Sequence, residues 1–434
     1  MSLMTIGVLG ILILIALLFS NMPVGFVMGF VGFLGFCYVR GMEAGLSLLI
    51  RDFFEVFSSY GLTVIPLFVF MGQIAFYSGI SRRLYDSAHI IIGNRPGGLA
   101  IATIGACAGF SAICGSTNAT AATMATVTIP EMKRYGYDMG LASGTVAAAG
   151  SLGILIPPSV IFIVYGILTE QSIGKLFAAG ILPGILLSLL FILTVYIRVR
   201  LNPELAPAGA ATASLEKWKA FTGLLETLFI FGLVMGGIFF GFFTPTEAAG
   251  IGAFLTLLVA LLRRQLSWDG FVQSLSDTTR ISCMVMVIVA GAIVFGHFMA
   301  ITRLPYDLAN WVSGLPLPPY MIICLIILVY LFGGCFMDSL AMIILTVPIF
   351  FPIILKLGFD PIWFGVVIVL ITEMGVITPP VGVNVYVVYG VAKDIPLETI
   401  FKGVLPMLLA LIVCNLIILV FPQIVLFLPG LMNG

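Results

Sequence analysis

Two short segments combine residue types that could bind small ions through exposed backbone groups. They are Gly153 to Ser159, with the sequence GILIPPS, and Gly375 to Val381, with the sequence GVITPPV. Each lies within an apolar stretch of about thirty residues, where a Pro-Pro pair removes two backbone donors and clashes with the preceding helical turn. We therefore predict a broken helix at each pair. Its freed backbone groups must face protein or a wet cavity, because lipid cannot satisfy them.

A polar stretch before the first break could complete a Na⁺ site. Hydroxyls, an amide and glycines gather there at the tip of an apolar segment, and such groups in hydrocarbon need partners. The residues that we expect to bind Na⁺ at this first site are Ser111, Gly115, Ser116, Asn118, Gly153 and Pro157. Tight helix packing through Gly105 and Gly109 is the alternative explanation for the small residues.

The second break also has a polar stretch before it. This stretch contains Asp338, one of very few carboxylates within an apolar segment, and a functional role is the default hypothesis for such a residue. The residues that we expect at a second Na⁺ site are Gly333, Asp338, Ser339, Thr378, Pro380 and Gly382.

Three further polar residues near the breaks are predicted to contact a substrate, namely Ser159, Glu373 and Asn384. Glu373 could instead hydrogen-bond loose backbone beside the second Pro-Pro pair, and the sequence favours neither role. Thr244 and Glu247 have a structural interpretation. The sequence TPTE fits a capping box, with Thr244 as the N-cap and Glu247 at the third helical position.

The composition indicates a helical protein that crosses a lipid bilayer many times. Of the 434 residues, 61% are hydrophobic and 9% are charged, and about ten windows are long enough to span a membrane. The net charge is +0 without a basic tail, so we expect no nucleic acid as a partner. The chain contains no Walker, HExxH or GxSxG motif, so we expect no enzymatic activity.

The sequence contains a duplication. Shifting the chain by 222 residues superimposes five pairs of prolines, and two of these pairs are the Pro-Pro residues of the breaks. With 23 prolines in 434 residues, about 0.6 coincidences are expected by chance. We therefore predict an all-α polytopic protein with two repeats, each with five crossings, a re-entrant hairpin and a helix broken at Pro-Pro. Because five is odd, the second repeat must have inverted topology.

Each predicted repeat has an outer scaffold and an inner transport part. Repeat 1 covers 1–200, with scaffold at 1–59 and 176–200, transport part at 60–175 and a hairpin at 98–128. Repeat 2 covers 222–434, with scaffold at 222–279 and 396–434, transport part at 280–395 and a hairpin at 318–356. A cytoplasmic linker, 201–221, joins them, and the stretches 40–58 and 264–279 are expected to lie along the membrane interface as amphipathic arms.

The basic residues indicate the orientation. With the N-terminus outside, 14 of the 19 Lys and Arg residues fall on the inner side. This is the bias that the positive-inside rule demands, and the opposite orientation would reverse it. No basic region precedes the first apolar run, so we expect a first membrane span there and no cleaved signal peptide.

Three motifs link the chain to a known family. They are GIFFGFFTPTEAAG at residues 237–250, GILIPPS at 153–159 and EMGVITPPVG at 373–382. With these motifs the chain resembles, over essentially its whole length, the large membrane subunit of the tripartite ATP-independent periplasmic (TRAP) transporters. The resemblance implies secondary transport driven by a Na⁺ gradient through an elevator motion. It also implies the bacterial inner (cytoplasmic) membrane, where the orientation above makes the N-terminus periplasmic.

The resemblance also implies two protein partners, a small four-helix membrane subunit and a periplasmic substrate-binding protein. We expect the small subunit to be a separate polypeptide. Family substrates are organic acids such as C4-dicarboxylates, sialic acid and other sugar acids, and Na⁺ at the tips would organise helix N-termini that attract a carboxylate. A stand-alone Na⁺-coupled carboxylate symporter is the main alternative. A membrane-embedded enzyme or a purely structural subunit is a second alternative.

Overall fold

The computed structural model describes residues 2–20, 22–208 and 214–432. Within these ranges every regular element is a helix and no strand occurs, which confirms the predicted all-α class. The predicted linker, 201–221, is shorter than expected because helices extend into it from both sides, ending at Leu201 and beginning again at Ser214. Residues 209–213 of the linker lie outside the described ranges.

The first half consists of five helical segments, a helical hairpin, a broken helix and one long helix. The segments before the hairpin are α1 (Leu3–Leu18), α2 (Val24–Arg40), α3 (Met42–Ser58), the short 3-10 helix η1 (Tyr60–Thr63) with α4 (Val64–Tyr77), and α5 (Ile80–Ile92). The hairpin is α6 (Gly98–Cys114) with α7 (Thr117–Arg134). The rest is α8 (Met139–Ala149), α9 (Leu152–Leu155), α10 (Val160–Thr169), α11 (Ile173–Leu201) and the 3-10 turn η2 (Pro203–Leu205).

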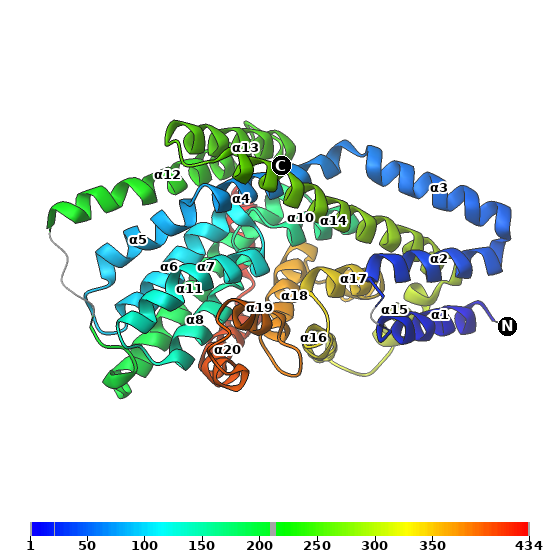
Figure 1. Cartoon of the computed structure of the whole chain (residues 1–434). Coiled ribbons are helices and arrows are strands. Elements are labelled where there is room, and N and C mark those ends of the chain that lie inside the picture. The colour runs from blue at the N-terminus through cyan, green and yellow to red at the C-terminus, as the bar shows by residue number, and fades with distance from the viewer. Residues whose placement is uncertain (1, 21, 209–213, 433–434) are drawn as a thin grey trace.

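The second half has a similar order of helices. It begins with α12 (Ser214–Phe239), α13 (Pro245–Leu262), α14 (Trp268–Thr302) and α15 (Leu304–Ser313). The second hairpin is α16 (Pro319–Gly334) with α17 (Ser339–Lys356). The remaining helices are α18 (Pro361–Val376), α19 (Val383–Val391), α20 (Leu397–Val420) and α21 (Gln423–Leu431). In Figure 1, α1 to α3 lie at one end of an elongated molecule, and α5 and α12 reach the other.

Several helix bounds in the two halves correspond at the offset found in the sequence. The helices α7 and α17 are both 18 residues long, and their starts and ends differ by 222 positions. Other helices are divided differently, since α18 matches α8 and α9 together, and α14, a single helix of 35 residues, matches α3, η1 and α4 together. Most of the stretch 264–279, predicted to lie along the membrane interface as an arm, is therefore continuous with the helix that follows it. Ser59 takes extended backbone angles and interrupts the first-half helix, whereas the equivalent Ile281 continues α14.

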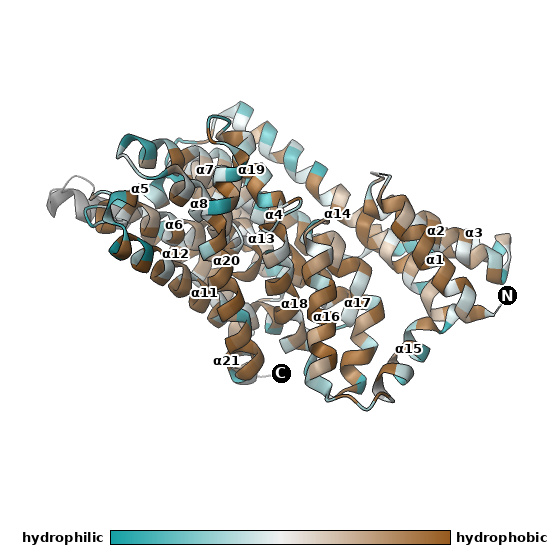
Figure 2. Cartoon of the chain, turned by 90° about the horizontal axis from the view of Figure 1, so that it is seen from below, coloured by the Kyte–Doolittle hydropathy of each residue, from teal (hydrophilic) through white to brown (hydrophobic). Residues whose placement is uncertain are grey.

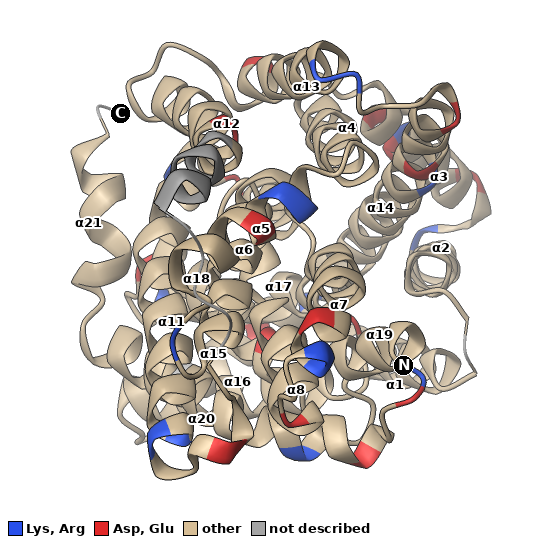
Figure 3. Ribbon diagram, turned by 60° about the vertical axis from the view of Figure 1, so that its left-hand side comes forward, with Lys and Arg blue, Asp and Glu red and all other residues tan. Residues whose placement is uncertain are grey.

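The described helices have the composition of a multi-pass membrane protein. Seven of them are long and apolar enough to cross a membrane, and several shorter ones are also apolar. Figure 2 shows apolar residues along most helices, with polar residues concentrated on α5, α15 and helix ends. Figure 3 shows that most of the ribbon carries no charged residue.

Many helix pairs join the first half to the second, and three of them make the most extensive contacts. The helix α2 packs along α14, α4 packs along α13, and α8 packs along α20. Glycines allow the closest approaches, since a Cβ on Gly403 of α20 would lie 1.9 Å from the Gly140 carbonyl oxygen of α8. The two halves therefore share one core, and neither half packs as an independent unit.

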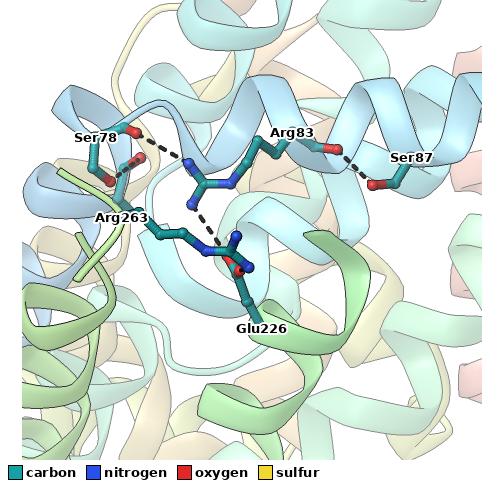
Figure 4. Close-up of polar contacts among 6 residues, drawn as sticks. Ser78, Arg83, Ser87, Glu226 and Arg263 are labelled. Carbon is teal, nitrogen blue, oxygen red and sulfur yellow. Dashed lines mark hydrogen bonds and ion pairs between the residues drawn. The ribbon is translucent and has the colours of Figure 1, made fainter. Parts of the chain in front are cut away.

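An ion-pair network ties α5 to α12 and α13, as Figure 4 shows. Arg83 Nη2 lies 3.2 Å from Glu226 Oε2, and Arg263 pairs with the other oxygen of the same carboxylate. Arg83 also donates a hydrogen bond of 3.4 Å to the Ser78 carbonyl. None of these residues lines the cavity described below, so the network is a structural link between helices.

The capping box predicted at the start of α13 is present. Thr244 Oγ1 accepts a hydrogen bond of 3.3 Å from the Glu247 amide, and Glu247 Oε2 accepts one of 2.8 Å from the Thr244 amide. Pro245 occupies the first helical position, where its missing N–H group costs nothing. Thr244 and Glu247 thus satisfy backbone donors at a helix start.

Candidate functional site

Both hairpin tips line one cavity of about 730 Å³. The first hairpin contributes Cys114 to Ala119, and the second contributes Asp338 to Ala341. The opposite wall is mainly apolar and comes from α2 and α14, with side chains that include Phe26, Met284 and Ile288. The cavity therefore separates the polar tips from the apolar outer helices.

Four helices begin at the wall of this cavity. Their first residues all line it, and they are Thr117 of α7, Val160 of α10, Ser339 of α17 and Val383 of α19. The first turn of a helix has amide groups without intrahelical acceptors and carries the positive end of the helix dipole. The cavity lining contains no Lys, Arg or His, so the helix starts are its main source of positive potential. Such a site can bind a carboxylate.

The first tip is in direct backbone contact with the first break. Gly115 ends α6 with a φ of +64°, which favours glycine, and a Cβ there would lie 2.5 Å from the Pro158 carbonyl oxygen. Ser116 caps α7 by accepting a hydrogen bond of 3.4 Å from the Ala119 amide. A Cβ on Gly153 would lie 2.6 Å from the Ser116 carbonyl oxygen. The tip and the break are therefore packed closely against each other through their backbones.

Several oxygens near the first tip have no hydrogen-bond partner within the described ranges. Ser111 Oγ and Asn118 Oδ1 are buried and unpaired, and no backbone hydrogen bond ends on the Pro157 carbonyl. Buried oxygens normally have partners, and unwound carbonyls with polar side chains are the groups that coordinate Na⁺ in transporters. The alternative of tight packing finds no support at Gly105, which is exposed and has no atom within 4 Å of its Cβ position. It finds support at Gly109, where a Cβ would lie 2.8 Å from Leu84 Cδ2.

The second tip makes a matching contact with the second break. A Cβ on Gly375 would lie 2.5 Å from the Gly334 carbonyl carbon, and the Val381 amide donates a hydrogen bond of 3.3 Å to the Cys335 carbonyl. Asp338 is the N-cap of α17, where its carboxylate accepts a hydrogen bond of 3.1 Å from a backbone amide of the first turn. Asp338 is exposed to the cavity and is the carboxylate of its lining.

The two sites that the sequence predicted separately are adjacent. Glu373 Oε1 accepts a hydrogen bond of 2.9 Å from Ser339, and Glu373 Oε2 accepts one of 3.3 Å from Thr117. The Asn118 amide lies within hydrogen-bonding reach of the Asp338 carboxylate. The sequence analysis missed Thr117. The offset of 222 residues pairs Thr117 with Ser339, and this was the signal that could have identified it.

The three predicted substrate contacts lie outside the cavity lining and have structural partners instead. Ser159 caps α10 by accepting a hydrogen bond of 3.4 Å from the Phe162 amide. The Asn384 amide donates a hydrogen bond of 3.2 Å to the Ala147 carbonyl. Glu373 lies behind the two tips, where 1% of its surface is exposed. Their role as substrate contacts stays a prediction.

Seven other predicted ligands do not line the cavity. Those outside the cavity lining are Ser111, Gly153 and Pro157 of the first site, and Gly333, Thr378, Pro380 and Gly382 of the second. The Thr378 hydroxyl donates to the Met374 carbonyl, and the Gly333 carbonyl accepts the amides of the tip. Both helices are interrupted at Pro-Pro as predicted, and both Pro-Pro bonds are cis. The two breaks differ in exposure, since Pro157 is buried and Pro380 is exposed.

Comparisons with known proteins agree with this architecture. The family model of the tripartite ATP-independent periplasmic transporter, DctM component, matches residues 11–424. The C4-dicarboxylate TRAP transporter large permease protein DctM of Pseudomonas aeruginosa is 40% identical over 390 residues, which is 88% of this chain and 89% of the relative. The sialic acid TRAP transporter large permease protein SiaM of Vibrio cholerae is 34% identical over 423 residues, 97% of each chain. The YdaH transporter of Alcanivorax borkumensis shares the fold, with a TM-score of 0.65 at 17% identity, over 88% of this chain and 89% of that chain.

Proposed function

The chain belongs to the DctM family of tripartite ATP-independent periplasmic transporters, and from this membership we propose that it is a permease subunit for Na⁺-driven uptake of an organic acid. The names of the relatives support a C4-dicarboxylate, sialic acid or another sugar acid as the substrate. One observation carries the proposal. Both hairpin tips, and helices that start after both breaks, line the same cavity.

Sodium ions are the driving substrate in this proposal. The unpaired oxygens of Ser111 and Asn118, with free carbonyls at the first Pro-Pro pair, support a cation site at the first tip. The carboxylate of Asp338 supports a second cation at the neighbouring tip. Bound cations would offset the negative charge of Asp338 and Glu373, so that the helix starts can hold a carboxylate.

An elevator motion is consistent with the walls of the cavity. The polar side consists of the hairpin tips and breaks, which contact each other through backbone at Gly153 and Gly375. The opposite side consists largely of apolar side chains of α2 and α14, two helices packed along each other. An apolar wall forms no hydrogen bonds that a polar unit would have to break in order to slide past it.

The proposal includes the surroundings that the family implies. The protein lies in the bacterial inner membrane with a periplasmic N-terminus and acts with a small membrane subunit and a periplasmic substrate-binding protein. It is a transporter and not an enzyme. A relative named as an isethionate TRAP transporter permease protein DctMQ is 38% identical, and this chain covers 59% of it.

Uptake by proteoliposomes tests the proposal. The purified membrane subunits should accumulate a radiolabelled C4-dicarboxylate or sialic acid only with an inward Na⁺ gradient and the binding protein. Asn118→Ala should raise the Na⁺ concentration for half-maximal uptake at least tenfold, or by about 1.4 kcal/mol of binding free energy. Thr126→Ala is the matched control on the same helix, because its exposed hydroxyl donates only to the Ala122 carbonyl.

Two results would contradict the proposal. Uptake that persists without Na⁺ would remove the coupling ion. Full uptake without a binding protein would instead identify a stand-alone symporter, which keeps the Na⁺ site and loses the tripartite assembly.

A further inference from the structure

One carboxylate connects the two hairpin tips. Glu373 stands near the end of α18, and each of its oxygens accepts a hydrogen bond from a different hairpin. Ser339 donates from the second hairpin at 2.9 Å, and Thr117 donates from the first at 3.3 Å. All three residues are buried, with 1% of Glu373, 3% of Ser339 and 7% of Thr117 exposed. The carboxylate of Glu373 is therefore buried behind the cavity lining, whereas Thr117 and Ser339 belong to that lining.

The side chains of Glu373, Ser339 and Thr117 have few other hydrogen-bond partners. Within the described ranges, Glu373 forms no ion pair, and neither hydroxyl has a second hydrogen bond. If one tip withdrew, one oxygen of a buried carboxylate and one hydroxyl would lose their only partner. Leaving a buried polar group unpaired costs about 1–3 kcal/mol, and more when the group is charged. The position of each tip is thus energetically linked to Glu373, and through it to the other tip.

We propose that Glu373 is a positioning residue that couples the two tips, so that Na⁺ binding at one tip raises Na⁺ affinity at the other. This inference rests on the proposed Na⁺-driven function. When a cation fixes the first tip, Thr117 holds Oε2 and restrains the carboxylate, which then presents Oε1 to Ser339. The second tip is then ordered before its own cation binds. Binding of that cation therefore has a smaller cost in conformational entropy. Coupling of this kind is reciprocal, since each site must change the affinity of the other by the same factor.

Conservative variants can remove either of the two hydrogen bonds to Glu373. Ser339→Ala removes the hydroxyl of the second tip, and Thr117→Val removes that of the first while keeping its shape. The matched control is Thr372→Val. Thr372 is the buried neighbour of Glu373, and its hydroxyl donates only to the Val369 carbonyl of the same helix at 2.8 Å. Thermal unfolding of each variant in detergent establishes that it is folded.

Two native cysteines report on the tips separately. Cys114 lies at the first tip and lines the cavity, and Cys335 lies at the second tip. Both cysteines are buried in this structure, so the rate of alkylation measures how far each tip opens. The complex of membrane subunits is titrated with NaCl against choline chloride, and site-resolved mass spectrometry follows each cysteine. In the unmodified protein, Na⁺ should slow alkylation of both cysteines.

The diagnostic effect is the one that crosses between tips. Ser339→Ala should raise the Na⁺ midpoint for protection of Cys114 at least threefold, and Thr117→Val should raise the midpoint for Cys335 by a similar factor. The combined variant should shift each midpoint by less than the product of the single effects, because either change alone already breaks the link through Glu373. The direct contact of Asn118 with Asp338 is the same in every variant and does not affect this comparison. Thr372→Val should leave both midpoints unchanged.

Two outcomes overturn the coupling and differ from one another. If each substitution affects only the cysteine of its own tip, the tips bind independently and Glu373 merely satisfies two hydroxyls. If Na⁺ protects neither cysteine in the unmodified protein, the Na⁺-driven function itself fails, and the coupling fails with it.

Discussion

Replacing Gly153 with alanine should weaken Na⁺ binding by pushing the first hairpin tip away from its break. The added Cβ would lie 2.6 Å from the Ser116 carbonyl oxygen and 2.8 Å from the Thr117 amide nitrogen. Ordinary contacts begin at 3.4 Å, so the tip must retreat by about 0.8 Å, and backbone atoms cannot rotate away as a flexible side chain can. Overpacking of this kind costs about 1–3 kcal/mol.

The change in Na⁺ affinity can be calculated if the overpacking destabilises the Na⁺-bound arrangement and leaves the Na⁺-free one unchanged. A cost of about 1.4 kcal/mol corresponds to a tenfold change, so the half-saturating Na⁺ concentration for uptake should rise by roughly 5- to 150-fold. Gly105→Ala in the same hairpin is the matched control, because no atom lies within 4 Å of its Cβ position and alanine favours a helix. Equal Na⁺ dependence of the two folded variants in proteoliposomes would refute the idea that tip and break form one site. Gly375→Ala, which meets Gly334 at 2.5 Å, should act in the same direction at the second tip.

Two further predictions concern stability and are measured as thermal unfolding in detergent. Thr244→Ala should destabilise the protein by about 1 kcal/mol, because it removes the N-cap of α13, and Thr244→Ser should restore most of the loss; an unchanged transition in the alanine variant would show that the capping box is not needed. Gly403→Ala should lower the unfolding temperature strongly, because its Cβ would lie 1.9 Å from the Gly140 carbonyl oxygen, whereas Gly390→Ala should not, because no atom lies within 4 Å of that Cβ position. Similar transitions for these two glycine variants would contradict the close packing of α8 on α20.

The elements of the candidate site could be predicted from sequence where the cause is local. A Pro-Pro pair interrupts a helix whatever surrounds it, and α9 and α18 do end before their pairs, at Leu155 and Val376. The turns of the hairpins also follow local chemistry, since Gly115 can adopt a left-handed conformation and Ser116 can cap the next helix. The capping box at Thr244 belongs to the same class.

The roles of individual side chains depend on the other half of the chain, and the sequence analysis had no access to that. Glu373 aligns with Ser151, so the duplication gave no hint that its carboxylate would contact both tips. Ser159 carries a hydroxyl close to a break, which made it a candidate for substrate binding, and in the structure this hydroxyl caps the helix that starts there. Caps and ligands require the same residue types, and only the arrangement in space separates them.

The two breaks differ in exposure, and this difference also could not be predicted from local sequence. Both have a Pro-Pro pair, a preceding glycine that contacts a tip, and a helix that starts at the cavity, yet Pro157 is buried and Pro380 is exposed. A local motif determines backbone conformation, whereas exposure depends on what packs against the motif. The first break lies against α11, where a Cβ on Gly180 would meet the Leu155 carbonyl oxygen at 2.4 Å. If the polar unit moves as an elevator, its contact with the surroundings must change while these local contacts persist. Exposure of Pro380 should therefore vary between states, and the contact of Gly375 with Gly334 should not.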